Sequence, residues 1–256
     1  MRMVAVVLGG GTGQRLGAGM PKQLLTLGGQ TLIERCVAAF EAAPGVDEIL
    51  VVMASGYTRQ VRELVAGFQK VIAVIEGGAT RPESTRAALA AIAEGGTGWA
   101  GYAGGAGWAT GGDPLRPPAV GGGSDCGVLL HDAARPLVDQ KIIAACVAAL
   151  EAHDAAGVAV PASDTMVLTE NGVMHSVPPR ERLFRCHTPQ CFRLSVIAKA
   201  HELAAADPDF TPTDDCGVVL RYLPGTAVHI VPGSERNMKI TYPRDLAVAE
   251  ALLSGD

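Results

Sequence analysis

Several features that would mark other classes of protein are missing from this chain. No stretch is rich in lysine or arginine, and 21 basic residues against 26 acidic ones give a formal net charge of -5. This balance argues against a protein whose main partner is the nucleic-acid backbone. Residues 1–30 alternate a short apolar strand with a glycine loop, unlike a signal peptide or a membrane span of about 20 apolar residues. We therefore expect a cytoplasmic protein with neither nucleic acid nor membrane as partner.

The sequence also lacks a Cys-x-x-Cys pair. Its six cysteines lie far apart, mostly inside apolar or helical patterns, at Cys36, Cys126, Cys146, Cys186, Cys191 and Cys216. This spacing favours thiols buried in the core over a metal-binding or disulfide-bonded set.

What the chain does have is a repeated pattern of strands and helices. Its 256 residues, 48% of them hydrophobic, predict one domain (1–256) with one sizeable core. Runs rich in valine and isoleucine predict buried strands at 4–8, 48–53, 71–75, 127–130, 157–160 and 228–231. Stretches rich in alanine and leucine predict helices at 31–43, 58–68, 83–94 and 141–153. The alternation predicts an α/β fold, doubly wound around a mostly parallel sheet, with ligands bound at the carboxyl ends of the strands.

One segment, 95–125, breaks this pattern. It is dense in glycine and contains Trp99 and Trp108, but it shows no periodicity. The composition predicts a disordered insertion, to which we assign no chemistry, although the two tryptophans leave a partner-binding role open.

A glycine-rich loop follows the first predicted strand. Without side chains, its glycines let backbone N–H groups close on phosphate oxygens; they are Gly9, Gly10, Gly11 and Gly13. The loop lacks the Gly-Lys-Ser/Thr ending of a Walker A motif, which argues against an ATPase. The second strand ends without an acidic residue to bind a ribose, which argues against a nicotinamide-dependent oxidoreductase. The nearby cations Arg15 and Lys22 instead suit a triphosphate whose leaving group carries negative charge.

Further strings follow in a fixed order along the chain. They are Gly9-Gly10-Gly11-Thr12-Gly13-x-Arg15 with Pro21-Lys22-Gln23, Gly77-Gly78-x-x-Arg81-x-x-Ser84, His131-Asp132-Ala133-Ala134-Arg135-Pro136, Asp164-Thr165-Met166 with Thr188-Pro189-Gln190, and Asn237-Met238-Lys239-Ile240-Thr241 with Pro243 and Asp245-Leu246. Together they resemble the 2-C-methyl-D-erythritol 4-phosphate cytidylyltransferase family over nearly the whole chain outside the insertion. The resemblance implies a Rossmann-like nucleotidyltransferase fold. It also implies that CTP and the polyol phosphate yield 4-diphosphocytidyl-2-C-methyl-D-erythritol and pyrophosphate, in the non-mevalonate isoprenoid pathway.

The resemblance also implies roles for individual residues. The implied catalytic residues are Arg15, Lys22, Arg180 and Lys239. The implied nucleotide-binding residues are Gly9, Gly10, Gly11, Gly13, Gly77, Gly78, Ser84 and Asp132. The implied acceptor-binding residues are Asp132, Arg135, Thr165, Arg180, Thr188, Thr213 and Lys239. A carboxylate beside a triphosphate makes sense chiefly with Mg²⁺ between them, so Asp132 is also the expected metal ligand.

Alternatives remain for several of these positions. Arg135 can equally form a structural ion pair with Asp132, and His131 is better explained as a packed or hydrogen-bonded side chain than as a ligand. Gly77, Gly78 and Ser84 can form a plain turn and first helical turn.

The segment 164–187 is polar, and Asn171-Gly172 within it is a hairpin turn signal. It resembles the β-arm of the family, which crosses the arm of a second subunit. The resemblance therefore predicts a homodimer, in which Thr165 and Arg180 of one chain hold the acceptor phosphate in the site of the other. Arg182 and Arg185 lie close to Arg180 and are alternative phosphate ligands.

Three rival functions remain. Ribitol 5-phosphate cytidylyltransferase shares CTP and most of the loops, so only the polyol contacts separate it from the main hypothesis. A nicotinamide-dependent oxidoreductase would use the glycine loop, but the strand-end acid is missing. A non-catalytic nucleotide sensor would not need the set formed by Arg15, Lys22, Asp132 and Lys239.

Overall fold

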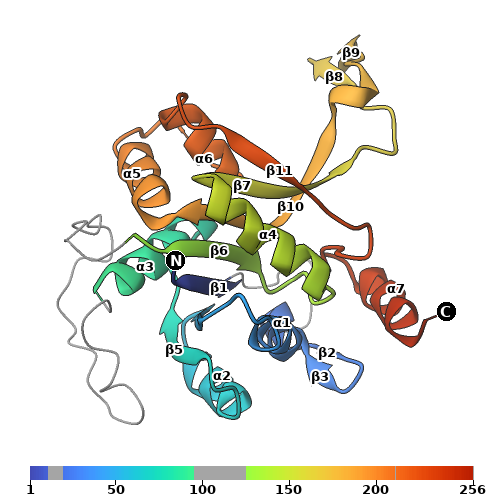
Figure 1. Cartoon of the computed structure of the whole chain (residues 1–256). Coiled ribbons are helices and arrows are strands. Elements are labelled where there is room, and N and C mark those ends of the chain that lie inside the picture. Colours follow the sequence, from blue (N-terminus) through green and yellow to red (C-terminus); the bar gives the residue numbers. More distant parts are fainter. Residues whose placement is uncertain (11–19, 95–124, 211, 256) are drawn as a thin grey trace.

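The computed structural model describes residues 1–10, 20–94, 125–210 and 212–255. A seven-stranded sheet forms its centre, in the order β11-β7-β10-β6-β1-β4-β5 (Figure 1). The strands are β1 (Met3–Gly9), β4 (Glu48–Met53), β5 (Val71–Glu76), β6 (Gly127–Asp132), β7 (Ala155–Pro161), β10 (Phe184–Arg193) and β11 (Val228–Pro232). All neighbouring pairs are parallel except those that β10 makes with β6 and β7. The predicted doubly wound, mostly parallel α/β fold is confirmed.

Helices cover both faces of the sheet because successive strand residues point to opposite sides. One face packs against α1 (Leu32–Glu41), α2 (Thr58–Val65) and α4 (Gln140–Ala152). The other face packs against α3 (Arg81–Glu94), α5 (Leu194–Ala205) and α6 (Asp215–Tyr222). Each strand in the middle of the sheet is therefore buried on both sides, as the fully buried residues of β1 show.

A smaller apolar cluster fixes the C-terminal helix α7 (Pro243–Ser254). It joins Leu27, Leu32, Ile240 and Ala249, and so connects the two ends of the chain. Next to it lie a 3-10 turn (Lys22–Leu24) and the two-stranded ribbon of β2 (Thr26–Leu27) and β3 (Gln30–Thr31). No helix in the described part of the chain has the length and apolar character needed to cross a membrane.

The sequence patterns predict six strands of the central sheet and four of its helices, but not β10. The segment has no apolar run and contains His187-Thr188-Pro189-Gln190 at its centre, so it lacks the pattern of a buried strand. It is nevertheless buried from His187 to Phe192 because it runs between β6 and β7. The predicted insertion, 95–125, lies outside the described residues apart from Asp125.

A hairpin forms the predicted arm, with β8 (Leu168–Glu170) and β9 (Val173–Ser176) as its strands. Asn171 and Gly172 form the turn with φ of 50° and 80°, the left-handed conformation that a tight hairpin turn requires. The predicted turn is confirmed, and the arm extends away from the sheet (Figure 1). The last residues of the predicted arm segment, 184–187, belong to β10.

Candidate active site

The carboxyl ends of β1, β5 and β6 meet at one edge of the sheet. Gly77 N–H donates to the carbonyl of Met53 at 2.8 Å, and Ala133 N–H donates to the carbonyl of Leu8 at 2.9 Å. These bonds hold the loops after the strands against one another. Gly9, Gly77 and Asp132 are therefore brought to one place, as expected for a ligand site in a parallel sheet.

Glycine is required where these loops converge on α3. A Cβ atom would lie 2.7 Å from Ser84 Oγ if placed on Gly10, and 2.6 Å if placed on Gly77. A Cβ atom on Gly78 would clash with Glu83. Ser84 is buried, and its hydroxyl donates to the carbonyl of Thr80 at 3.0 Å. The structure thus joins four of the predicted nucleotide residues in a tight backbone cradle; Gly11, Gly13 and Arg15 lie outside the described residues.

Asp132 lies at the centre of a charge network. Arg81 Nε lies 3.1 Å from Asp132 Oδ1, and Lys239 Nζ lies 2.6 Å from Oδ2. Arg81 also reaches Asp215 with Nη1–Oδ2 at 2.7 Å. Burial alone would raise the pKa of Asp132, but the charges of Arg81 and Lys239 outweigh burial and hold the pKa below its usual value. Asp132 is therefore a carboxylate at neutral pH.

Sequence reasoning assigned no role to Arg81 or Asp215. Arg81 did stand in one of the family-like strings, and the adjacent pair Asp214-Asp215 was a visible signal. Nothing local indicated that they would meet, because α3 and α6 are neighbours only through the tertiary fold.

The C-terminal loop brings Lys22 and Lys239, two of the expected catalytic residues, together at this edge. Lys22 Nζ donates to the carbonyl of Ile240 at 2.8 Å, directly beside Lys239. Asn237, fully buried, donates to the carbonyl of Thr188 at 2.8 Å, and Ile240 N–H donates to the carbonyl of Ala134 at 2.8 Å. The loop is thus fixed by hydrogen bonds on both sides of Lys239.

Arg135 supports this loop as well. Its guanidinium donates to the carbonyls of Asn237 at 2.8 Å and Cys186 at 3.4 Å. The proposed ion pair with Asp132 is replaced by pairs that Asp132 makes with Arg81 and Lys239. Arg135 therefore lies beside Asp132 but stabilises the neighbouring backbone through these two carbonyls.

His131 is buried and hydrogen-bonded, as predicted. Its Nε2 lies 3.0 Å from the carbonyl of Arg135, and its Nδ1 lies 3.1 Å from Thr188 Oγ1. Burial lowers the pKa of His131 to about 4, so the ring is neutral at pH 7. A carbonyl only accepts, so Nε2 carries the proton and Nδ1 accepts from the Thr188 hydroxyl. That hydroxyl also accepts from Asp132 N–H at 3.1 Å, so Thr188 orients Asp132.

The remaining predicted acceptor residues lie elsewhere. Arg180 Nη2 donates to Thr165 Oγ1 at 2.9 Å within the exposed arm. Arg185 pairs with Glu235, and Thr213 is exposed just before α6. The structure of one chain therefore joins Lys22, Asp132 and Lys239, and separately joins Thr165 to Arg180.

With this geometry established, comparison with known proteins identifies the family. The family model for 2-C-methyl-D-erythritol 4-phosphate cytidylyltransferase matches residues 3–99 and 119–255. The chain belongs to this family. The stretch between the two matched parts falls inside the predicted insertion. Membership confirms the resemblance drawn from the motifs and makes the chain a nucleotidyltransferase enzyme.

Individual members of the 2-C-methyl-D-erythritol 4-phosphate cytidylyltransferase family match over nearly their whole length. The enzyme of that name from Thermobifida fusca (strain YX) is 48% identical over 259 residues, covering 98% of this chain and 93% of the relative. The crystal structure of the Thermus thermophilus enzyme is 30% identical with a TM-score of 0.68, covering 97% of this chain and 98% of that one.

A less similar relative is named for a different reaction. The bifunctional ribulose 5-phosphate reductase/CDP-ribitol pyrophosphorylase Bcs1 of Haemophilus influenzae is 33% identical over 97% of this chain and 48% of the relative. The methylerythritol enzyme from T. fusca is more similar in sequence, so the comparisons favour the methylerythritol hypothesis over the ribitol one.

Proposed function

We propose that this site transfers the cytidylyl group of CTP to 2-C-methyl-D-erythritol 4-phosphate, releasing pyrophosphate. The main support is the meeting of Lys22 and Lys239, from opposite ends of the chain, beside the Asp132 carboxylate. Such a cluster provides fixed positive charge where phosphate oxygens must be crowded together.

The nucleotide half of the site is the glycine cradle. The loop of Gly9, Gly10, Gly11 and Gly13 binds the triphosphate through backbone N–H groups, and Arg15 and Lys22 neutralise the departing pyrophosphate. Backbone groups of Gly77 and Gly78, with the Ser84 hydroxyl, bind the polar edge of cytosine. The close approach of Gly10 and Gly77 to Ser84 supports this assignment, because it places phosphate and base contacts side by side.

The chemical step needs positioned charge more than a base. The acceptor phosphate is already an anion near pH 7, since the second pKa of a monoester is about 6. Its oxygen attacks the α-phosphate of CTP in line with the bond to pyrophosphate, and that bond breaks. Lys22, Arg15 and Lys239 stabilise the extra negative charge of the transition state. No covalent enzyme intermediate is required.

Mg²⁺ fits the donor set at Asp132. Magnesium is usually held by one or two carboxylates together with substrate phosphates, and Asp132 supplies one carboxylate, kept ionised by its neighbours. When bound, the ion would add positive charge at the triphosphate. Lys239 and Arg81 orient Asp132 for this role through their contacts with its two oxygens.

The acceptor half of the site is shared between two subunits in this proposal. Thr165 and Arg180 lie together on the arm, where they would hold the acceptor phosphate in the partner's site, and Arg135, Thr188 and Thr213 border the polyol. Apolar side chains on the arm are strongly exposed, with Leu168 at 56%, Val173 at 68% and Met174 at 73%. Exposed apolar surface of this kind is typical of a protein-protein contact, which supports a homodimer.

Release of pyrophosphate tests the proposal. The chain is incubated with CTP and Mg²⁺, with 2-C-methyl-D-erythritol 4-phosphate and ribitol 5-phosphate as acceptors in parallel reactions. Turnover with methylerythritol phosphate and little with ribitol phosphate is the expected result. Turnover with ribitol phosphate alone would support cytidylyl transfer but reject methylerythritol phosphate as the acceptor, and no turnover with either would reject the function.

A further inference from the structure

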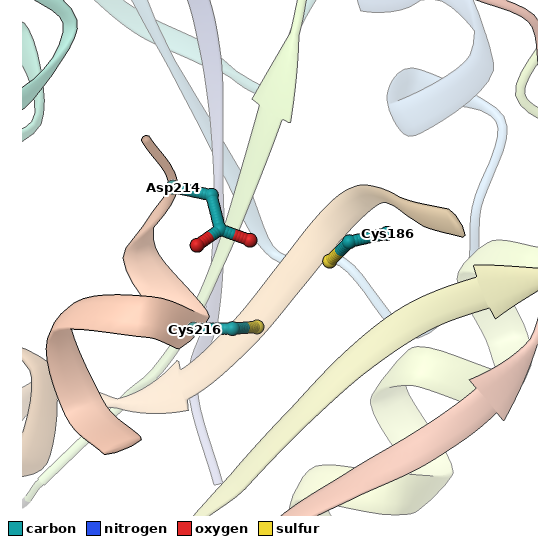
Figure 2. A group of neighbouring side chains, drawn as sticks. All are labelled: Cys186, Asp214 and Cys216. Carbon is teal, nitrogen blue, oxygen red and sulfur yellow. The ribbon is translucent and has the colours of Figure 1, made fainter. Parts of the chain in front are cut away.

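A second group of chemically active side chains lies at the start of α6, apart from the Lys22–Asp132–Lys239 cluster. Cys186 on β10, Asp214 just before α6 and Cys216 in its first turn point toward one another (Figure 2). Their two sulfur atoms and a carboxylate oxygen all lie within 4.8 Å of one another. Among the described residues, a search for three or more His, Cys, Asp or Glu side chains that lie close enough to share one metal ion finds this group.

Gln190 holds this cluster in place. Its Nε2 donates to Asp214 Oδ2 at 2.8 Å and to Cys186 Sγ at 3.1 Å. Its Oε1 accepts from the backbone N–H groups of Asp215 at 2.9 Å and Cys216 at 3.1 Å. One carboxamide therefore ties β10 to the first turn of α6 and brings the two cysteines together.

The backbone is also shaped for these side chains. The pairing of β10 with β7 shifts register between Cys186 and Gln190, which leaves room for their side chains beside α6. A Cβ atom on Gly157 of β7 would lie 2.8 Å from Cys216 Sγ. The absence of a side chain at Gly157 therefore creates the space that the sulfur occupies.

We propose that Cys186, Asp214 and Cys216 form a binding site for a thiophilic divalent cation, with Zn²⁺ as the best match. Two thiolates and one carboxylate are typical zinc ligands, whereas Mg²⁺ prefers oxygen alone. Zinc bonds of about 2.0 to 2.3 Å in a tetrahedron separate the ligand atoms by about 3.5 to 4 Å, and the three atoms here all lie within 4.8 Å of one another. Binding releases the thiol protons to solvent.

One coordination position remains for water or another small ligand. Cys186 is exposed whereas Asp214 is partly exposed and Cys216 is buried, so the ion enters from the Cys186 side. The site does not rest on the proposed transferase chemistry, since none of its three ligands belongs to the catalytic set. It does lie near that chemistry, because the carbonyl of Cys186 accepts from Arg135 at 3.4 Å.

Titration with Co²⁺, followed by displacement with Zn²⁺, tests the proposal on the full chain kept reduced. We expect one ion per chain, with a thiolate-to-Co²⁺ charge-transfer band in the near ultraviolet that Zn²⁺ removes. The Cys186→Ala variant should lose the band. Asp214→Asn should weaken Zn²⁺ binding at least about tenfold, because the amide nitrogen that replaces Oδ2 neither binds the ion nor accepts from Gln190 Nε2. The asparagine oxygen still accepts from Gly217 N–H and so preserves the helix cap.

A matched cysteine variant controls for general effects on the fold. Cys126→Ala removes a thiol from the buried core outside the cluster and should leave the Co²⁺ band and the Zn²⁺ affinity unchanged. Substitution at exposed Cys186 should not cost the fold, and circular dichroism verifies this for each variant. The proposal is overturned if the reduced chain gives no band, or if Cys186→Ala and Asp214→Asn bind Zn²⁺ as tightly as the parent. A disulfide between Cys186 and Cys216 with no Zn²⁺ binding after reduction would also overturn it.

Discussion

Lys22 and Lys239 illustrate at the residue scale how the site is prepared before substrate arrives. Hydrogen bonds hold both ammonium groups: Lys22 donates to the carbonyl of Ile240 and Lys239 to the carboxylate of Asp132. Flexible lysine side chains are thereby kept in one region, which lowers the entropy cost of forming the transition state.

Substitution of Lys22 tests whether it acts on the transition state. Lys22→Ala should lower kcat by about 10²-fold or more, with a much smaller change in KM for CTP. Steady-state rates of pyrophosphate release measure both constants. Lys70→Ala is the matched control, because Lys70 also donates to a backbone carbonyl, that of Ala43 at 2.7 Å, but lies outside the site. An unchanged kcat in Lys22→Ala would remove Lys22 from the catalytic set.

His131 should make the stability of the fold depend on pH. Its pKa of about 4 in the folded chain lies below the unfolded value, so between the two values the unfolded chain binds more protons. The free energy of unfolding should therefore fall as pH drops through this window, by about 2 kcal/mol for His131 between about pH 7.5 and about pH 5. Urea titrations of the parent and of His131→Gln measure this contribution as the difference between their pH slopes.

A second variant tests whether the pH effect comes from the buried position of His131 or from replacing any histidine. His175 is exposed on β9, and His175→Gln is the matched histidine-to-glutamine control. Equal slopes in the parent and in His131→Gln would contradict the assigned role of His131.

At the scale of whole elements, Arg81 connects three parts of the fold. It extends from α3 to Asp132 at the end of β6 and to Asp215 in α6. Both carboxylates are buried, and Asp215 also contacts His201 with Oδ1–Nε2 at 3.0 Å. Arg81 thus bridges two buried carboxylates, of which Asp132 is also paired with Lys239, and connects α6 to the site.

Substitution of Arg81 should lower the stability of the fold. Arg81→Met keeps much of the side-chain length but removes the guanidinium from buried Asp215 and one of the two cations from Asp132, so the free energy of unfolding should fall by about 3 kcal/mol. Arg59→Met removes an exposed ion pair with Glu63 and should cost less than about 1 kcal/mol. Guanidinium titrations of both variants test the difference; similar losses would show that Arg81 is no more important than a surface charge.

At the scale of the whole molecule, the site of one chain is incomplete under the proposed function. Lys22, Asp132 and Lys239 lie at the sheet edge, whereas Thr165 and Arg180 lie on the protruding arm. Two chains with crossed arms would unite the two halves, and the exposed apolar side chains of the arm would then be covered.

Mixing inactive variants tests this sharing. Chains with Arg180→Ala and chains with Lys22→Ala should each be nearly inactive alone. After unfolding and refolding together, hybrid dimers should regain about a quarter of the parent activity per total site if the subunits assort randomly. Refolded mixtures that stay as inactive as the separate variants would indicate that Arg180 acts within its own chain.

Local sequence determined much of this protein, because some signals need no knowledge of the fold. Apolar runs alternating with helical periodicity specify the doubly wound sheet, Asn171-Gly172 specifies a hairpin turn, and Asp132 ends its strand as its position after an apolar run suggests. The string of family-like motifs then identified the chemistry before any geometry was known.

Contacts between distant residues depend on how the elements pack in three dimensions. β10 has no apolar run in its sequence and becomes buried through its two neighbouring strands. Arg81 contacts Asp215 only because α3 and α6 cover the same face, and Cys186 lies near Cys216 where β10 shifts its register against β7. Periodicity along the chain reports which face of an element is buried. The order of strands in the sheet sets the contacts between elements, and that order follows from the packing of the whole molecule.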